Sequence, residues 1–232
     1  FYCTRWCGVN HWRMRGIIDV EGERTGVQTV SPPLYVSINL NLDEEFEALS
    51  VPDEIPSPIR GKELIQQIDL DDQLLSSDYY RKQSPYQVFE TLNSTNLSED
   101  ERWDIVAYLW QINTTLTGLE TGRELYARNC AACHGENGAG DGVFADDLLK
   151  AGQQAAQTMN GEREMAMQIP SDFTDPRHLL AKSPAYLQGK ILRGGMGTGM
   201  PMWGSIFTEQ QLWDLVAYLY TFYFKYPNKE VQ

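Results

Sequence analysis

The sequence has no long apolar run, few cysteines and histidines, and too few basic residues to balance its acidic ones. A membrane-spanning helix needs about 20 predominantly apolar residues, and Lys225 and Pro227 interrupt the aromatic stretch near the C-terminus. Lys and Arg number 19 against 32 Asp and Glu, which gives a net charge of -13. This balance argues against nucleic acid and anionic membrane surfaces as partners, and it favours a partner protein with a basic patch.

The four cysteines form two tight pairs, Cys3 with Cys7 and Cys130 with Cys133. A disulfide framework would scatter its cysteines over the fold, whereas close spacing of this kind is typical of metal or cofactor chemistry. The length of 232 residues allows one or two domains.

The second pair belongs to the motif Cys130–His134, CAACH, which is typical of covalent haem attachment. The two sulfurs would form thioethers with the haem, and the His134 imidazole would be the proximal iron ligand. A zinc site would need two more ligands, and downstream only His178 is available. A thioredoxin-like site would need a βαβ setting, but Cys130 ends a helical pattern and precedes a glycine-rich loop.

Residues 117–232 resemble a class I cytochrome c. Gly122 and Tyr126 share one helical face that leads into Cys130, and Leu215 and Tyr218 match the usual contact of the C-terminal helix. The resemblance implies a mainly α, class I cytochrome c helical fold, one covalent haem c and electron transfer. It also implies that a carbonyl near Pro170 accepts the Nδ1 proton of the proximal histidine.

The resemblance places the distal iron ligand in the glycine-rich stretch 193–204. The family has a methionine directly before proline, which selects Met200 ahead of Met196 and Met202. Trp203 would then lie along the haem rim, and Arg193 could meet a haem propionate. The stretch before it, 150–168, looks like an inserted helix.

An internal repeat precedes the cytochrome-like part. The segment 103–109, WDIVAYL, recurs as WDLVAYL at 213–219, and Gly61–Leu64 and Ser84–Pro85 have counterparts in the same order. The first copy lacks a CxxCH motif, and no methionine lies between Met14 and Met159. Residues 59–116 are therefore predicted to be a degenerate, haem-free cytochrome c-like half. The alternative is an unrelated helical hairpin.

The first 20 residues resemble the C-terminal ligand loop of a CuA cupredoxin domain, with a short β segment at 16–20. The family's copper-ligand positions fall on the side chains of Cys3, Cys7, His11 and Met14 and on the backbone carbonyl of Arg5. Thiolate, imidazole and thioether are a set that suits copper. The centre needs a second histidine, expected before Phe1, so the site is incomplete here. The alternative is a pair of cysteines that are free or oxidised to each other.

Residues 21–58 combine prolines with acidic residues and are predicted to be a linker, in which 34–38 could form a strand. The whole pattern predicts electron transfer through a His/Met haem to the CuA centre of a terminal respiratory oxidase. Other oxidase subunits would then be partners, at the periplasmic or extracytoplasmic face of a bacterial membrane. The alternatives are the haem domain of a nitrous oxide reductase and a stand-alone periplasmic cytochrome c. Whether the chain belongs to an enzyme stays open.

Overall fold

The computed structural model describes residues 31–150, 170–195 and 199–226, and the regular elements within these ranges are all helical. The predicted mainly α fold is confirmed. The CuA-like loop, its β segment at 16–20 and most of the expected inserted helix lie outside the described residues. None of the helices in the described ranges is long and apolar enough to cross a membrane.

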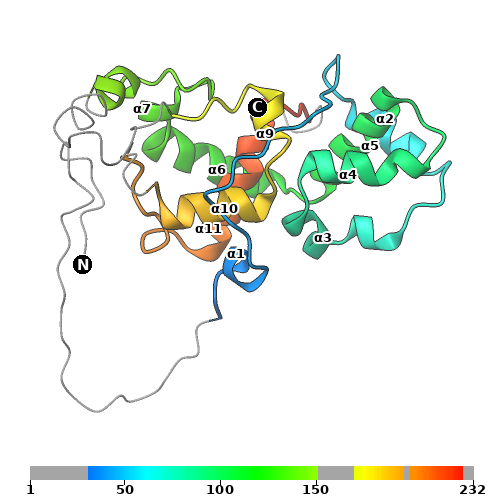
Figure 1. Cartoon of the computed structure of the whole chain (residues 1–232), viewed down its shortest axis with the longest axis horizontal. Helices are drawn as coiled ribbons and strands as arrows, with labels where there is room; N and C mark the ends of the chain where they lie inside the picture. Colours follow the sequence, from blue (N-terminus) through cyan, green and yellow to red (C-terminus); the bar gives the residue numbers. More distant parts are fainter. Residues whose placement is uncertain (1–30, 151–169, 196–198, 227–232) are drawn as a thin grey trace, which may run out of the picture.

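The helices form two groups side by side (Figure 1). A short helix, α1 (Leu34–Ser37), precedes both groups. The first group contains α2 (Pro58–Leu64), η2 (Asp72–Leu75), α3 (Ser77–Lys82), α4 (Pro85–Thr91), η3 (Leu92–Ser94) and α5 (Glu99–Ile112). The second contains α6 (Leu116–Asn129), α7 (Ala131–His134), α9 (Pro176–Leu179), α10 (Pro184–Arg193), α11 (Glu209–Leu219) and η4 (Tyr220–Phe222).

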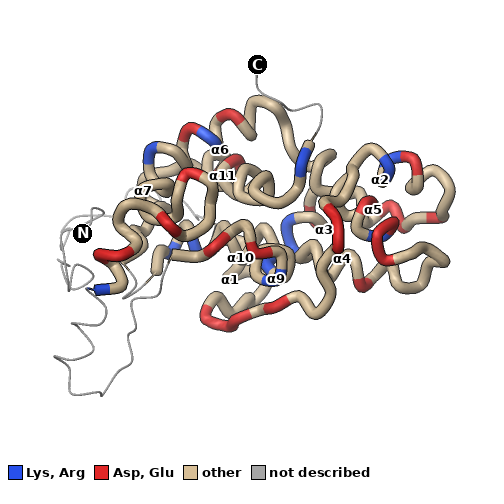
Figure 2. Tube along the Cα trace, turned by 90° about the horizontal axis from the view of Figure 1, so that it is seen from above, with Lys and Arg blue, Asp and Glu red and all other residues tan. Residues whose placement is uncertain are grey.

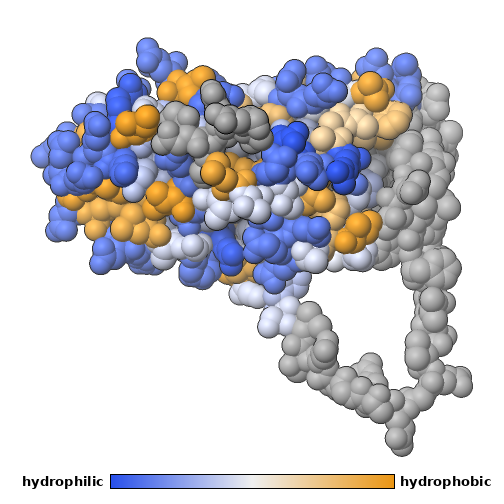
Figure 3. All heavy atoms as spheres, turned by 180° about the vertical axis from the view of Figure 1, so that it is seen from behind, coloured by the Kyte–Doolittle hydropathy of each residue, from blue (hydrophilic) through white to orange (hydrophobic). Residues whose placement is uncertain are grey.

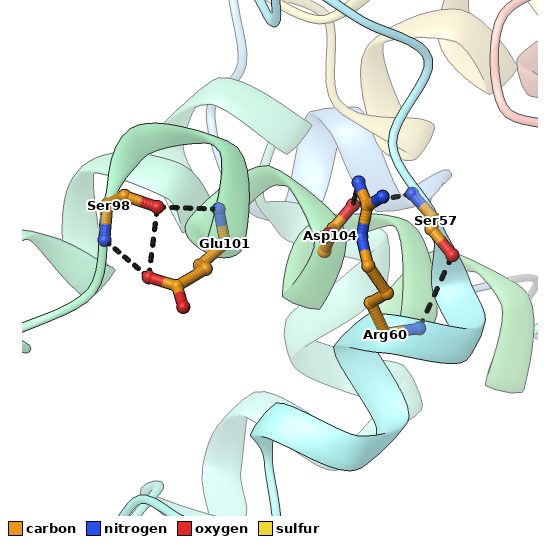
Figure 4. Close-up of polar contacts among 5 residues, drawn as sticks. All are labelled: Ser57, Arg60, Ser98, Glu101 and Asp104. Atoms are coloured by element: carbon orange, nitrogen blue, oxygen red, sulfur yellow. Dashed lines mark hydrogen bonds and ion pairs between the residues drawn. The ribbon is translucent and has the colours of Figure 1, made fainter.

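Corresponding helices of the two groups begin with the same local chemistry. Ser84 caps α4 and Ser183 caps α10, and each is followed by proline at the first helical position, where the missing N–H costs nothing. A capping box opens α5 through Ser98 and Glu101 (Figure 4). Thr208 and Gln211 open α11 in the same way.

Each group is built on one crossing of two helices at a glycine. A Cβ atom at Gly61 of α2 would lie 2.0 Å from the carbonyl oxygen of Asp104 in α5. At Gly122 of α6 it would lie 2.3 Å from the carbonyl oxygen of Asp214 in α11. No residue with a side chain fits at such a distance, so both crossings depend on glycine.

The polar contacts around the two aspartates differ. Asp104 is buried and accepts hydrogen bonds from the Ser57 amide at 2.5 Å and from Arg60 Nε at 2.6 Å (Figure 4). Asp214 accepts from Gln210 Nε2 of its own helix at 2.8 Å. The aspartate carboxylate therefore joins the two crossing helices in the first group, whereas in the second group it bonds within its own helix.

The two groups share one hydrophobic core. The Trp110 ring of α5 meets the Tyr220 ring edge-on, with 5.8 Å between centroids, and also packs against Phe224. The Tyr86 amide donates to the Leu180 carbonyl at 2.9 Å. The first group is thus packed directly against the second through buried side chains.

The segment 34–38, where a strand was considered possible, is helical instead. The Pro33 carbonyl accepts from the amides of Val36 and Ser37 at 3.0 and 3.1 Å. Proline has its φ angle near the helical value, so it can start a turn as readily as it ends a strand.

Residues 40–50, which we call the strap, belong to the predicted linker and pack against the second group. Figure 1 shows this segment passing over α10 and α9 towards α2. Leu42 and Ala48 are buried, and the Ala48 amide donates to the Arg177 carbonyl at 3.0 Å. The strap is also acidic, and Figure 2 shows Asp and Glu along the loop beside α1, α9 and α10.

Apolar side chains also reach the surface. Figure 3 shows them in several groups set among polar residues on the face opposite that of Figure 1. Among the most exposed are Leu49 and Val143, at 91% and 81% of their full area. A surface of mixed polarity like this is ordinary for a globular protein.

Candidate haem site

The CxxCH motif lies at the junction of two helices. Cys130 is the C-cap of α6 and the N-cap of α7, and its carbonyl accepts from the amides of Cys133 at 3.0 Å and His134 at 2.9 Å. Gly135 ends the turn with a φ of 81°, a conformation that favours glycine. The Tyr126 hydroxyl, one helical turn before the motif, donates to the Gly135 carbonyl at 2.8 Å. Both thiols are free.

The His134 ring is oriented from two sides. Its Nδ1 lies 3.2 Å from the carbonyl oxygen of Ser171, and the Phe173 ring stacks on it with 5.0 Å between centroids. With the Nδ1 proton donated to that carbonyl, the Nε2 lone pair is available to a metal. The resemblance placed the acceptor near Pro170, and the structure places it one residue later. The Pro170 carbonyl instead lies against Gly140, where an added Cβ would come within 2.4 Å of it.

Burial shifts the pKa values of the three motif side chains. It raises the pKa of Cys130, which also has Cys133 beside it, to about 12, and it raises the pKa of Cys133. Burial lowers the pKa of His134, against the Ser171 carbonyl, which raises it. A thioredoxin-like site needs a lowered thiol pKa, so this environment argues against that alternative. A neutral imidazole is the form that ligates iron.

Residues 199–204, which contain Met200 and Met202 and which we call the methionine segment, are held against the end of α10 by backbone hydrogen bonds. The amide of Trp203 donates to the Ile191 carbonyl at 3.2 Å, and that of Gly204 donates to the Leu192 carbonyl at 3.1 Å. These carbonyls lie in the last turn of a helix, where they lack partners within the helix. The segment is therefore positioned by the end of a neighbouring helix.

A cavity of about 560 Å³ lies between α7, α10 and the methionine segment. Cys130, Cys133, His134 and Met200 all line it. Pro170, Pro201 and Trp203 line it too, together with apolar residues of α10 and α11. The volume falls within the range of about 300–1,000 Å³ that is usual for cofactor sites. Two thiols, an imidazole and a thioether around one apolar cavity are the side chains that a haem c with His/Met ligation requires.

Other metal chemistry finds less support. Within residues 31–150, 170–195 and 199–226, no three His, Cys, Asp or Glu side chains lie close enough to hold a metal ion. The zinc alternative, which needs four ligands, therefore has no ligand set in the described part of the chain.

Comparison with known proteins agrees with this site. The family described as "Cytochrome C oxidase, cbb3-type, subunit III" matches residues 117–219. These residues are a cytochrome c domain. The match supports a c-type haem in this domain and electron transfer as its chemistry.

The full-length comparisons add little beyond this domain. No curated protein matches the chain. Among solved structures, a chain of the reducing HAO-like protein complex of Kuenenia stuttgartiensis is 15% identical, with a TM-score of 0.35. The match covers 75% of this chain and 99% of that one. A TM-score this low carries no argument about fold or function.

The three candidate methionines of the cytochrome c domain have different positions. Met200 lines the cavity and Met202 does not, while Met196 lies outside the described residues. Trp203 lines the cavity and stacks on Phe207, with 4.9 Å between centroids. The preference for Met200 over Met202 thus has the geometry in its favour.

Arg193 does not take the place that the resemblance suggested. Its guanidinium forms two hydrogen bonds to the Asp43 carboxylate of the strap, at 2.6 and 3.1 Å. It is also not among the residues that line the cavity. Lys182 and Lys190 are the cations that line it instead.

The sequence interpretation missed several residues at the cavity. Phe173, Lys182, Lys190 and Glu45 received no role, and His178 was considered only as a zinc ligand. His178 lines the cavity but is about half exposed, with Nε2 at 3.6 Å from an Asp175 carboxylate oxygen. Phe173 could have been found from its position three residues after Pro170, near which the resemblance places the acceptor of the His134 proton. Nothing in the sequence around Glu45 indicates a role at the cavity, because Glu45 lies far from the haem-attachment motif in the chain.

Proposed function

We propose that the cytochrome c domain passes single electrons between redox proteins through a low-spin haem with His134 and Met200 as its axial ligands. The observation that carries this proposal is the convergence of Cys130, Cys133, His134 and Met200 on one cavity. When bound, the haem supplies a one-electron iron couple whose potential is raised by the methionine sulfur. With His134 and Met200 both bound to its iron, a haem in this cavity would offer no open position for a substrate.

The surrounding residues hold the two proposed iron ligands in position. The Ser171 carbonyl and the Phe173 ring orient His134, and hydrogen bonds donated to carbonyls of α10 hold the loop that carries Met200. Fixed ligands lower the reorganisation that accompanies a change of charge at the metal, because the surroundings are already arranged. The chain's contribution is thus to fix the positions of the ligands.

Replacement of Met200 by Ala tests the ligand assignment. We expect loss of the weak ferric charge-transfer band of sulfur-ligated haem and a lower midpoint potential, with Met202→Ala as the matched control two residues away. A band that persists in Met200→Ala and disappears in Met202→Ala would overturn the assignment.

We further propose a terminal respiratory oxidase as the parent complex, with a CuA centre exchanging electrons with the haem. Two observations support this: the matched family is described as an oxidase subunit, and Cys3, Cys7, His11 and Met14 have CuA ligand spacing. A location at the extracytoplasmic face of a membrane follows from the same family. Copper analysis of the full-length natural protein tests the proposal, with two copper ions expected per polypeptide. Absence of copper would refute the oxidase and the nitrous oxide reductase as parent proteins, and would leave the stand-alone cytochrome c.

For residues 59–116 we propose a degenerate cytochrome c-like half without haem. The equivalent glycine crossings at Gly61 and Gly122 and the equivalent caps at Ser98 and Thr208 support common ancestry over an unrelated hairpin. A pyridine haemochrome assay should give one c-type haem per chain. Two haems per chain would refute the proposal.

A further inference from the structure

The cationic side of the haem cavity consists of two lysines. Lys182 and Lys190 lie near the Tyr186 ring, with Nζ at 6.0 and 5.4 Å from its centroid. Lys182 Nζ also donates to the His178 carbonyl at 3.1 Å. Among the ion pairs of the described residues, none joins either ammonium to a carboxylate within 4.0 Å.

The two ammonium groups are partly desolvated. Burial lowers the pKa of each lysine, and the Glu45 carboxylate raises both pKa values towards normal. A buried charge is costly unless a counter-charge accompanies it. Glu45, Asp172 and Asp175 also line the cavity, but none of their carboxylates lies within 4.0 Å of either ammonium. Both ammonium groups therefore remain available to the anionic groups of a ligand.

The strap brings Glu45 to the same cavity. Three contacts hold it there: the Asp43 carboxylate binds Arg193, the Glu44 carbonyl accepts from the Tyr186 hydroxyl at 3.1 Å, and the Ala48 amide bonds to Arg177. The Phe46 ring packs edge-on against Tyr186, with 5.7 Å between centroids. Glu45 lies between these anchors and lines the cavity.

The strap is also shaped to fit α10. A Cβ at Gly189 would lie 3.0 Å from the Leu42 side chain, so this glycine lets the strap approach the helix closely. The position of Glu45 is thus fixed on both sides by apolar and polar contacts of its neighbours in the strap, although its own carboxylate is exposed.

Haem c carries its charges at one edge. Thioether bonds to Cys130 and Cys133 would use the vinyl edge of the porphyrin, and the two propionates would extend from the opposite edge. We propose that Lys182 and Lys190 bind these propionates, and that the strap residue Glu45 forms part of the same site and lowers the midpoint potential of the iron. This inference rests on the proposed haem attachment.

The charge of each residue determines whether it raises or lowers the midpoint potential of the haem. A carboxylate near the haem stabilises the ferric form, which carries one more positive charge, and therefore lowers the potential. An ammonium on a propionate does the opposite. Because the Glu45 carboxylate is exposed, we expect a change of less than tenfold in the ferric to ferrous ratio at a fixed electrode potential, or about 59 mV for a one-electron couple.

Spectroelectrochemical titration of the haem-loaded chain tests this site. We expect Glu45→Gln to raise the midpoint potential and Lys190→Gln to lower it, while the optical spectrum of His/Met ligation stays unchanged. Glu54→Gln and Lys62→Gln are matched controls, since both residues are exposed and neither lines the cavity. Glu45→Asp and Lys190→Arg keep the charges and should restore most of the wild-type potential.

The outcomes separate this inference from the proposed function. Shifts of the same sign in both variants, or shifts no larger than those of the controls, would overturn the propionate site. A wild-type chain without a c-type haem spectrum would overturn the proposed function and, with it, this inference.

Discussion

Gly61 and Gly122 are the residues on which the helix crossings most directly depend. At both positions the space for a side chain is taken by the backbone of the opposite helix, which cannot move without displacing the whole element. A methyl group is therefore enough to disturb either crossing.

Replacement of Gly122 by Ala should destabilise the cytochrome c domain by about 1–3 kcal/mol, the usual cost of an overpacked core. Urea unfolding followed through the haem absorbance measures this loss. Thr117→Ala, at an exposed position in the same helix, is the control and should change stability by less than 0.5 kcal/mol or so. Equal stability of Gly122→Ala and the control would show that the helices can separate at no cost.

Asp104 is a buried charged residue of the first group. Its side chain is 3% exposed and that of Arg60 is 56% exposed, so water screens much of the ion pair. The Ser57 amide depends on the carboxylate more strongly, because it has a short bond to it at the start of α2. Loss of the carboxylate would leave this donor without its partner.

Asp104→Ala should therefore lower the free energy of unfolding by about 1–3 kcal/mol, the range for a buried group left unsatisfied. Asp104→Asn keeps an oxygen acceptor and should cost less. Thermal unfolding measures both, with Asp53→Asn as an exposed control. If the Asn variant lost as much as the Ala variant, the charge on Arg60 would matter more than the bond to Ser57.

Among the elements, the strap has an anchor that depends on pH. The hydrogen bond from Arg193 is the main cause that lowers the pKa of Asp43 below 3.8, and the charges of Arg193 and Lys190 lower it further, while burial opposes this. A carboxyl whose pKa is lower in the folded state stabilises that state above its ordinary pKa. This contribution disappears as the pH falls through the folded-state value.

We expect the strap to loosen below a pH of about 3.8. The amide of Ala48, bonded to Arg177, should lose hydrogen-exchange protection by no more than about fivefold, since an exposed ion pair contributes about 0.2–1 kcal/mol. In Asp43→Asn the protection should already be reduced at neutral pH. Protection that falls with the same pH profile in this variant would assign the effect to other carboxyl groups.

The elements also show which predictions a sequence can support. The CxxCH turn, the repeated helix with its caps and the segment around Met200 were recognisable because their residues are close together in the chain. The Arg193 contact was not, because Asp43 lies 150 positions away and nothing near Arg193 indicates a strap. The helix α1 (Leu34–Ser37) was missed because a short apolar run has no clear period.

For the whole molecule, the first group of helices is part of the folded unit that carries the haem cavity. Trp110 is 1% exposed and belongs to α5, yet its ring contacts Tyr220 and Phe224 of the cytochrome c half. The Tyr220 hydroxyl in turn donates to the carbonyl of Lys182 at 2.7 Å, beside the cavity. A continuous path of packing therefore joins the first group of helices to Lys182, one of the two lysines proposed to bind the propionates.

This packing predicts a single cooperative unfolding transition. In wild-type protein, tryptophan fluorescence and haem absorbance should report the same urea midpoint, as expected for one unit. Trp110→Ala should lower that midpoint for both probes, with a loss of about 3–5 kcal/mol for a large buried aromatic residue. Ile112→Ala is the control from the same helix, because Ile112 is 42% exposed. Trp110→Ala could instead move the fluorescence transition and leave the haem transition in place. The two groups of helices would then unfold independently, and the first group would not stabilise the haem site.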